Sequence, residues 1–236
     1  MHRFFIEQKL KKGIKINLPP DVSRQIFAVL RMKRGEMITL FDGSGQDFLS
    51  EIQEIKKGVC VAAIVEARPN KNEPSRKIIL FQSLIKKDKM EWVVEKCTEI
   101  GVSEVVPVLA ARSVKTGLNQ ARLEKIAKEA AEQSGRAVVP VIRPIAHLAE
   151  AISWAAENCE KVLFLHEKAD KIITPAMFKA RILGLFIGPE GGWSEEEASL
   201  ADNAGFSAVS LGARVLRAET AAIIASYFML REDLDS

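Results

Sequence analysis

The chain has 236 residues and a net charge of +3, with 47% hydrophobic residues, 28% charged residues and a mean hydropathy of +0.03. This composition excludes a disordered or collagen-like chain, and the length lies between one domain and two. No apolar run reaches the ~20 residues that a membrane-spanning helix needs. Charged residues close to the N-terminus argue against a signal peptide.

The first 72 residues have the pattern of a small β-rich domain. Short apolar stretches alternate with glycine-containing turns, which is typical of a small β-barrel or sandwich. The expected strands are residues 4–7, 37–41, 48–55 and 59–65. One helix is expected to begin at Pro20-Asp21 and to end before Gly35. The polar stretch 68–74, with two prolines, is the best linker candidate.

Residues 73–236 alternate between strands and helices. The expected strands are 78–84, 105–110, 138–142, 162–166, 183–187 and 208–211. The expected helices run from Asp88 to Gly101, over 119–134 and 148–157, from Thr174-Pro175 onward, from Ser194 to Gly205, and over 217–231. The pairs Asp88–Glu91 and Ser194–Glu197 have the spacing of capping boxes. The alternation predicts a mostly parallel sheet with helices on both faces.

Positive charge is concentrated in the first domain. Residues 1–72 hold 13 Lys and Arg against 8 Asp and Glu, a net charge of +5, whereas residues 73–236 hold 21 against 23, a net charge of −2. A basic domain joined to a slightly acidic one suggests that the first contacts a polyanion. Solubility alone explains the same charge equally well.

Several common site motifs are absent from the sequence. It has no Walker-type phosphate loop, no complete dinucleotide fingerprint and no G-x-S-x-G elbow. The three histidines and three cysteines lack metal-ligand spacing, so we expect no metal site. The odd number of cysteines favours a reduced, cytoplasmic setting. A kinase, a dehydrogenase, a zinc hydrolase and a serine hydrolase are each disfavoured.

Two glycine-rich loops at strand ends are the strongest functional features. The loop of residues 187–194, with the sequence IGPEGGWS, joins a buried strand to a capped helix. The loop of residues 211–220 places Arg217 and Glu219 near a helix start, where backbone N–H groups favour anions. Because open α/β sheets bind ligands at the carboxyl ends of their strands, the two loops are expected to share one ligand. Ordinary tight turns and a surface Arg–Glu pair are the structural alternatives.

These loops resemble the ribosomal small-subunit methyltransferase E family, of the SPOUT class of knotted methyltransferases. The resemblance is carried by IGPEGGWSEEE at 187–197 and LGARVLRAETA at 211–221, and it extends through residues 29–36, 89–101 and 129–136. It covers essentially the whole chain. It implies an RNA-binding, PUA-like β-barrel over residues 1–72. It also implies an α/β SPOUT methyltransferase domain, with a parallel sheet and a deep trefoil knot, over residues 73–236.

The resemblance further implies a homodimer that binds S-adenosylmethionine in the knot. The reaction it implies is methylation of N3 of one uridine in 16S rRNA, within the assembled small ribosomal subunit. The implied cofactor-binding residues are Leu165, Ile187, Gly188, Glu190, Gly192, Leu211, Gly212 and Leu216.

The implied chemistry sets requirements on the site. N3 of uracil is an imide nitrogen that must lose a proton before it attacks a methyl group on positively charged sulfur, and a dry site favours that encounter. We expect Arg217 to stabilise the uracil anion through O2 or O4. Glu219 and Glu190 are the candidate general bases, unless Glu190 only shapes the cofactor loop. The residues expected to contact RNA phosphates are Arg3, Arg24, Arg31, Lys33 and Arg34, with Lys9, Lys11 and Lys12 as further candidates.

Two other functions remain open at this point. Relatives that methylate the ribose 2′-OH have Ser-Leu-Asn-Val-Ser where this chain has LRAET at 216–220, and the arginine and glutamate here suit a base-directed reaction better. A non-catalytic assembly factor would bind RNA through the first domain and keep the second only as a scaffold. The intact glycine loops argue against that role.

Overall fold

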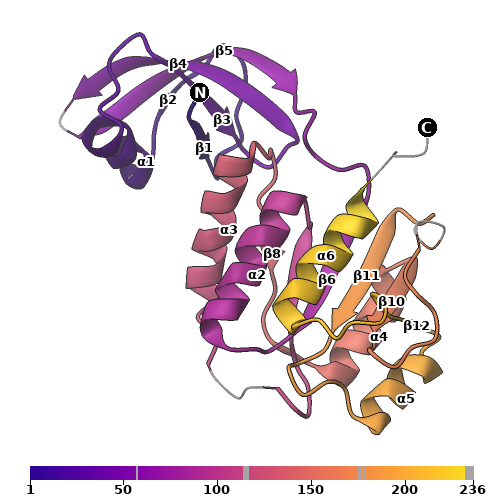
Figure 1. Cartoon of the computed structure of the whole chain (residues 1–236). Helices are drawn as coiled ribbons and strands as arrows, with labels where there is room; N and C mark the ends of the chain where they lie inside the picture. Colours follow the sequence, from indigo (N-terminus) through magenta and orange to yellow (C-terminus); the bar gives the residue numbers. More distant parts are fainter. Residues whose placement is uncertain (57, 114–116, 175–176, 178, 232–236) are drawn as a thin grey trace. The chain divides into compact units, whose positions relative to one another are not determined.

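The computed structural model describes residues 1–56, 58–113, 117–174, 177 and 179–231 (Figure 1). The chain divides into two units by its internal contacts. One comprises residues 1–73 together with 131–139, and the other comprises residues 74–130 and 140 onward. No local pattern in the sequence indicates that residues 131–139 belong with the first unit.

The first unit is built on a five-stranded sheet in the order β1-β3-β4-β5-β2. Its strands are β1 (Arg3–Phe5), β2 (Lys15–Asn17), β3 (Met37–Phe41), β4 (Gln46–Lys56) and β5 (Val59–Pro69). Strand β1 runs parallel to β3, and the other pairs are antiparallel. Helix α1 (Pro20–Arg24) continues into the π-helical turn η1 (Gln25–Val29). The four expected strands and the helix are present, and β2 was missed because three residues are too few to show a period.

Alternating side chains of these strands form one core. On β4 every second residue from Phe48 to Ile52 is buried, and Ile38 and Leu40 of β3 are fully covered. Ile26 of η1 is buried in the same cluster. The period of two is the reason that this segment forms strands with one apolar face.

Polar side chains order the end of the first unit. Glu73 accepts hydrogen bonds from the backbone N–H groups of Ala137 and Val138 at 2.8 and 3.0 Å, and it pairs with the buried Arg136 at 3.0 Å. Strand β5 itself continues to Pro69. Of the stretch 68–74 that was expected to be a linker, all residues up to Glu73 therefore belong to the first unit, and the second unit begins at Pro74.

The second unit contains a parallel sheet in the order β12-β10-β11-β6-β7-β8, with β9 paired to β7. Its strands are β6 (Lys77–Ser83), β7 (Glu104–Leu109), β8 (Val141–Ile142), β9 (Ala146–His147), β10 (Lys161–Leu165), β11 (Ile182–Ile187) and β12 (Ser207–Val209). All of these pairs are parallel. The predicted parallel sheet is confirmed, only the two-residue β9 having been missed. The trefoil knot stays a prediction of the resemblance.

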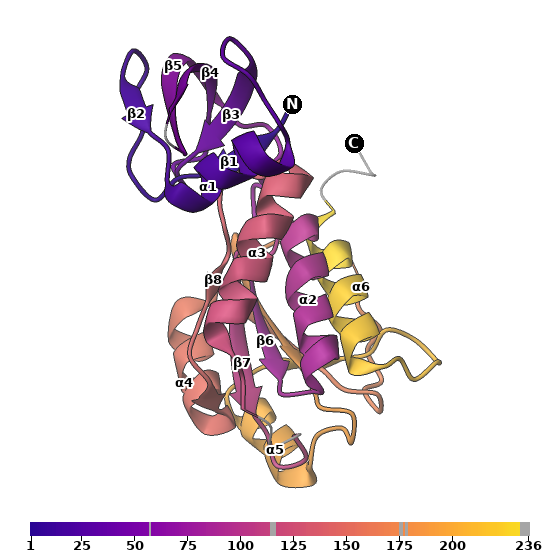
Figure 2. The same cartoon turned by 90° about the vertical axis from the view of Figure 1, so that its left-hand side faces the viewer.

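Helices cover both faces of this sheet (Figures 1 and 2). They are α2 (Lys87–Ile100), α3 (Gln120–Ser134), α4 (Leu148–Asn158), α5 (Glu195–Asn203) and α6 (Ala218–Leu230). Helices α2 and α6 pack together on one face, where Cys97 and Ser226 meet at 3.9 Å between Sγ and Oγ. Helix α4 covers the other face, where Phe81 stacks on Phe186 with ring centroids 4.2 Å apart. Both faces of the sheet are buried, which explains the nearly continuous apolar strands.

The two expected capping boxes differ in outcome. The hydroxyl of Ser194 accepts from the backbone N–H of Glu197 at 3.2 Å, and the carboxylate of Glu197 accepts from the backbone N–H of Ser194 at 2.8 Å. This capping box of α5 is therefore confirmed. The box of Asp88 and Glu91 is wrong, because α2 begins one residue earlier and no side chain caps it. Asp88 lies in the first turn, where the helix dipole still favours a carboxylate. Pro175, where a short helix was expected to begin, lies outside the described residues.

The cysteines are packing residues. Cys60 and Cys97 are buried, Cys159 is half-buried, and none of the three forms a disulfide. Burial raises the pKa of both Cys97 and Cys159 to about 12, so their thiols stay protonated and unreactive. In the described part of the chain no helix has both the length and the apolar character needed to cross a membrane.

Candidate active site

A cleft of about 630 Å³ lies at the carboxyl ends of the parallel strands. Residues that follow β7, β10, β11 and β12 line it, together with the start of α2, which follows β6. Because all these strands are parallel, their carboxyl ends meet at the same edge of the sheet. The volume falls within the ~300–1,000 Å³ typical of cofactor sites.

The residues expected to bind the cofactor come together there. The lining includes Leu165, Ile187, Gly188, Glu190, Gly192, Leu211, Gly212 and Leu216. Of the expected catalytic residues, Arg217 also lines the cleft. Glu219 is not part of the lining, but its carboxylate lies 3.4 Å from the ammonium of Lys89, a residue of the cleft wall.

Local geometry explains three of the glycines. A Cβ on Gly188 would meet the indole of Trp193 at 3.1 Å. Gly192 and Gly212 have φ angles of +68° and +105°, which side chains other than glycine rarely adopt. These positions therefore shape the two loops as well as bringing backbone to the cleft wall.

Trp193 ties the loop after β11 to the end of β10. Its buried indole Nε1 donates to the carbonyl of Leu165 at 2.9 Å, and its ring stacks on Phe164 with centroids 4.5 Å apart. The tryptophan of the glycine loop is thus an internal support that holds two walls of the cleft together.

The segment after β7 supports the same loop through Arg112 and through a hydrogen bond to Glu197 of α5. Arg112 Nη1 donates to the carbonyls of Gly191 and Trp193 at 2.9 and 3.4 Å. Glu197, which also caps α5, accepts from Ala111 N at 2.7 Å. Arg112 is separated by 79 residues from Gly191. It was missed by sequence reasoning because only the strand order brings the two segments together.

Lys89 joins three elements at the cleft. Its Nζ lies 2.6 Å from Oε1 of Glu190, in the loop after β11, and 3.4 Å from Oε1 of Glu219, in the first turn of α6. The hydrogen bond to Glu190 and the charges of both carboxylates raise the pKa of Lys89 above its usual value and outweigh the effect of desolvation. Lys89 belongs to a segment of the family resemblance, but sequence reasoning did not place it among the catalytic or cofactor-binding residues.

In the first unit the expected RNA-contacting residues divide into two groups. Arg24, Arg31, Lys33 and Arg34 are exposed on α1 and on the turn after η1. Arg3 has a side chain only 14% exposed and pairs with Asp47 at 2.7 Å. It also donates to the carbonyl of Arg136 at 2.9 Å. These contacts give Arg3 a structural role and argue against its facing RNA.

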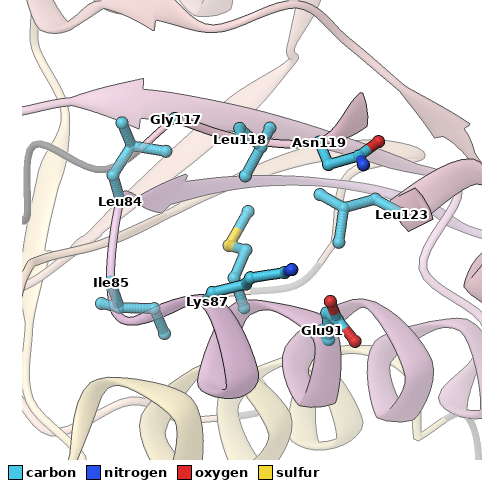
Figure 3. Close-up of a pocket in the computed structure, with 9 residues that line it drawn as sticks. Leu84, Ile85, Lys87, Glu91, Gly117, Leu118, Asn119 and Leu123 are labelled. Carbon is cyan, nitrogen blue, oxygen red and sulfur yellow. The ribbon is translucent and has the colours of Figure 1, made fainter. Parts of the chain in front are cut away.

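A second, much smaller cavity lies between the start of α2 and the start of α3 (Figure 3). Leu84, Ile85, Leu118 and Leu123 form much of its wall. Its volume of about 10 Å³ has room for about one water molecule, so it is no cofactor site. Across the described residues no three His, Cys, Asp or Glu side chains gather in a way that would hold a metal ion.

Known proteins resemble this chain over nearly its whole length. The family model of an RNA methyltransferase domain matches residues 71–230, and that of an RNA methyltransferase PUA domain matches residues 19–65. Ribosomal RNA small subunit methyltransferase E of Bacillus subtilis is 30% identical over 95% of this chain and 94% of its own length. The chain belongs to the ribosomal RNA small subunit methyltransferase E family.

Other members of the methyltransferase E family give the same result. The Rickettsia conorii protein is 29% identical over 95% of this chain and 93% of its own. The Neisseria gonorrhoeae member, in a crystal structure bound to S-adenosyl methionine, matches with a TM-score of 0.89 at 34% identity, over 96% of this chain and 95% of that chain. The resemblance predicted from the two glycine loops is confirmed, as is the PUA domain predicted for the basic first part.

Proposed function

We propose that this methyltransferase E family member transfers a methyl group from S-adenosylmethionine to N3 of one uridine in the 16S rRNA of the small ribosomal subunit. One observation carries the proposal. Both glycine loops reach a single cleft at the strand ends, beside the charged cluster of Lys89, Glu190 and Glu219.

The residues around the cleft fit S-adenosylmethionine. A Cβ added at Gly192 or Gly212 would have no atom within 4 Å, so the backbone there is open to a ligand. Apolar side chains beside the glycine backbone suit a nucleoside, and the nearby carboxylates of Glu190 and Glu219 suit a cation. When bound, this cofactor supplies a methyl group on positively charged sulfur. We propose that it is held by Leu165, Ile187, Gly188, Gly192, Leu211, Gly212 and Leu216.

Arg217 is the proposed donor to the uracil anion. It is the N-cap residue immediately before α6, its side chain is exposed, and it lines the cleft. Among the described residues no hydrogen bond or ion pair of its guanidinium is found. A guanidinium stabilises an oxyanion through strong, charge-assisted hydrogen bonds. An arginine and two carboxylates at this position favour an imide substrate, which must lose a proton and spread negative charge, over a ribose hydroxyl.

The first unit is proposed to contact the RNA through Arg24, Arg31, Lys33 and Arg34. Phe27, which is 38% exposed, lies in the same segment and offers a face on which a base can stack. Replacing all four basic residues by Ala should weaken RNA binding and reduce its salt dependence, because each phosphate that the protein neutralises adds about 0.7–0.9 to the slope of log K against log salt. Lys15→Ala is the control, since Lys15 is exposed in the same unit outside this set. An unchanged salt slope in the fourfold variant would contradict the proposal.

The proposed assembly is a homodimer. Trp92 of α2 and Ile224 and Tyr227 of α6 are 49%, 41% and 55% exposed on two adjacent helices. Large exposed apolar side chains of this kind mark interaction surfaces, and we propose that a second copy covers them. Sedimentation should show a dimer that Tyr227→Asp weakens. A ribosomal substrate implies a cytoplasmic location.

The decisive experiment maps 16S rRNA by mass spectrometry in cells that lack the protein. We expect 3-methyluridine to disappear at one position and to return with the wild-type gene. An unchanged 3-methyluridine signal would refute the proposal, and loss of a 2′-O-methyl group instead would favour the ribose alternative. Calorimetric titration with S-adenosylmethionine distinguishes a methyltransferase, which should bind the cofactor, from a non-catalytic assembly factor, which should not.

A further inference from the structure

Three charged side chains from three separate segments meet beside the cleft. Lys89 comes from the first turn of α2, Glu190 from the loop after β11 and Glu219 from the first turn of α6. Their side chains are 23%, 35% and 13% exposed. The ammonium of Lys89 therefore links the loop of residues 187–194 to α6, the helix that Arg217 immediately precedes.

The two carboxylates of this cluster are not equivalent. Glu190 is the nearer to Lys89, at 2.6 Å against 3.4 Å, so most of the attraction of the ammonium is directed to Glu190. Glu219 keeps a buried oxygen, Oε2, that has no hydrogen-bond partner among the described residues. A buried carboxylate oxygen without a partner is costly, so its place beside the cleft calls for an explanation. Rotation about the last side-chain bond of Glu219, which is soft, exchanges its two oxygens.

We propose that Glu219 accepts the proton of uracil N3 and that Lys89 is the positioning residue that holds it for this step. The assignment rests on the proposed function. The N3–H bond breaks, the proton passes to the Glu219 carboxylate, and the electron pair stays on N3. That pair would form the bond to the methyl carbon, while the bond from that carbon to sulfur would break and leave its electron pair on the sulfur of the departing cofactor product. Glu219 becomes a neutral acid, while Lys89 and Glu190 remain a neutral pair, so the proton removes the one unbalanced negative charge of the cluster.

Lys89 itself is not the acceptor. Its pKa is raised by the hydrogen bond to Glu190 and by the neighbouring carboxylate charges, so it stays an ammonium at neutral pH. Its ammonium lies between Glu190 and Glu219, at 2.6 and 3.4 Å, and so links α6 to the loop after β11. The other charged or titratable side chains that line the cleft are Arg112, His166, Glu167, Lys168, Glu195, Arg214 and Arg217.

The test measures single-turnover methylation of small ribosomal subunits that lack the methyl group, at saturating S-adenosylmethionine, beside calorimetric cofactor affinity. Glu219→Gln should slow the reaction at neutral pH by about 100-fold or more, the range of a lost general base. Its cofactor affinity should stay near that of the wild type. Its rate should then rise with hydroxide concentration, since solvent must remove the proton. Glu190→Gln should be the milder change, because Glu190 takes no proton.

Lys89→Met and Lys89→Arg test the positioning role. We expect Lys89→Met to slow the reaction by more than about tenfold, because it removes the ammonium that lies 3.4 Å from the Glu219 carboxylate and holds it in place. Lys89→Arg keeps the positive charge and should recover most of the rate. If Lys89 had only a packing role, the Met and Arg variants would be equally slow. Lys125→Met is the control, since it removes only an exposed lysine paired with Glu129 on α3.

Specific results would overturn the assignment. They are a Glu219→Gln rate within tenfold of the wild type, an equal or greater loss in Glu190→Gln, or no difference between the two Lys89 variants. Glu219→Asp keeps a shorter carboxylate and should have an intermediate rate, which guards against misfolding of Glu219→Gln. If the wild type binds S-adenosylmethionine but methylates no uridine, the proposed function fails, and this assignment with it.

Discussion

Replacement of Arg112 by Ala tests whether the glycine loop of residues 187–194, which we propose binds the cofactor, depends on support from the segment after β7. The guanidinium donates to two carbonyls of that loop, Gly191 O at 2.9 Å and Trp193 O at 3.4 Å. A hydrogen bond from a charged group is worth about 1.5–3 kcal/mol. The second bond is long and Arg112 is exposed, so solvent screening reduces the sum to about 1–2 kcal/mol.

The expected consequence is weaker cofactor binding by the Arg112→Ala variant. If the lost energy lowers the population of the binding-competent loop, the Kd for S-adenosylmethionine rises by about 5- to 30-fold. Calorimetric titration measures this change. Thermal unfolding should change little, because Arg112 is an exposed residue outside the hydrophobic core.

Two further variants separate loop support from the loss of a positive charge. Arg112→Lys retains the charge but can reach only one carbonyl, so its Kd should lie between those of Arg112→Ala and the wild type. Arg214→Ala removes an equal charge from an exposed residue of the same cleft and should change the Kd by less than about twofold. An unchanged Kd in Arg112→Ala, or an equal rise in Arg214→Ala, would refute the reasoning.

Three other changes give distinct results. Arg217→Ala should slow single-turnover methylation more than tenfold, about 1.4 kcal/mol of barrier, with cofactor affinity nearly intact; weak binding with a normal rate would mean that Arg217 holds the cofactor. Trp193→Phe leaves the carbonyl of Leu165 without its donor and should cost about 1–2 kcal/mol, lowering Tm by several degrees in calorimetry. Burial acts to raise the pKa of Asp47, but hydrogen bonds from Arg3 and Asn70 and the charge of Arg3 together lower it. Its contribution to stability is therefore present above about pH 4 and lost as pH falls through the lowered value, so Asp47→Asn should destabilise the protein at pH 7 and much less at pH 3 in urea unfolding.

The fold followed from the sequence wherever an element was long enough to show its period. Strand β6 and helix α2 were located within a residue or two because apolar residues recur at two- and 3.6-residue spacing. Strands β2 and β9, with three and two residues, carry no such signal. The polar stretch 68–74 has the composition of a linker, yet the carboxylate of Glu73 within it accepts from backbone N–H groups at Ala137 and Val138, more than 60 residues away. Polarity in sequence does not distinguish a solvated side chain from one that caps a distant segment.

The residues of the candidate site likewise fall into those that local sequence identifies and those that it does not. The two glycine loops were evident because their constraints are local: Gly188 contacts Trp193 five residues later, and Gly192 and Gly212 take backbone conformations of their own. Arg112 and Lys89 were not evident, because each acts on a loop formed from a different strand. Nothing in their immediate sequence distinguishes them from other basic residues.

The sequence pattern does not predict the order of the strands in the sheet. The periodic pattern identifies β6, β7 and β11 individually, but the site depends on β6 lying between the other two, which joins segments about one hundred residues apart. Once that order is known, the parallel direction of the strands brings the start of α2 and the segments after β7 and β11 to one edge. The Lys89–Glu190 ion pair is a direct consequence of this order, since β6 and β11 are neighbours. The same arrangement explains why one lysine can act on the cofactor loop and on the proposed proton acceptor at once.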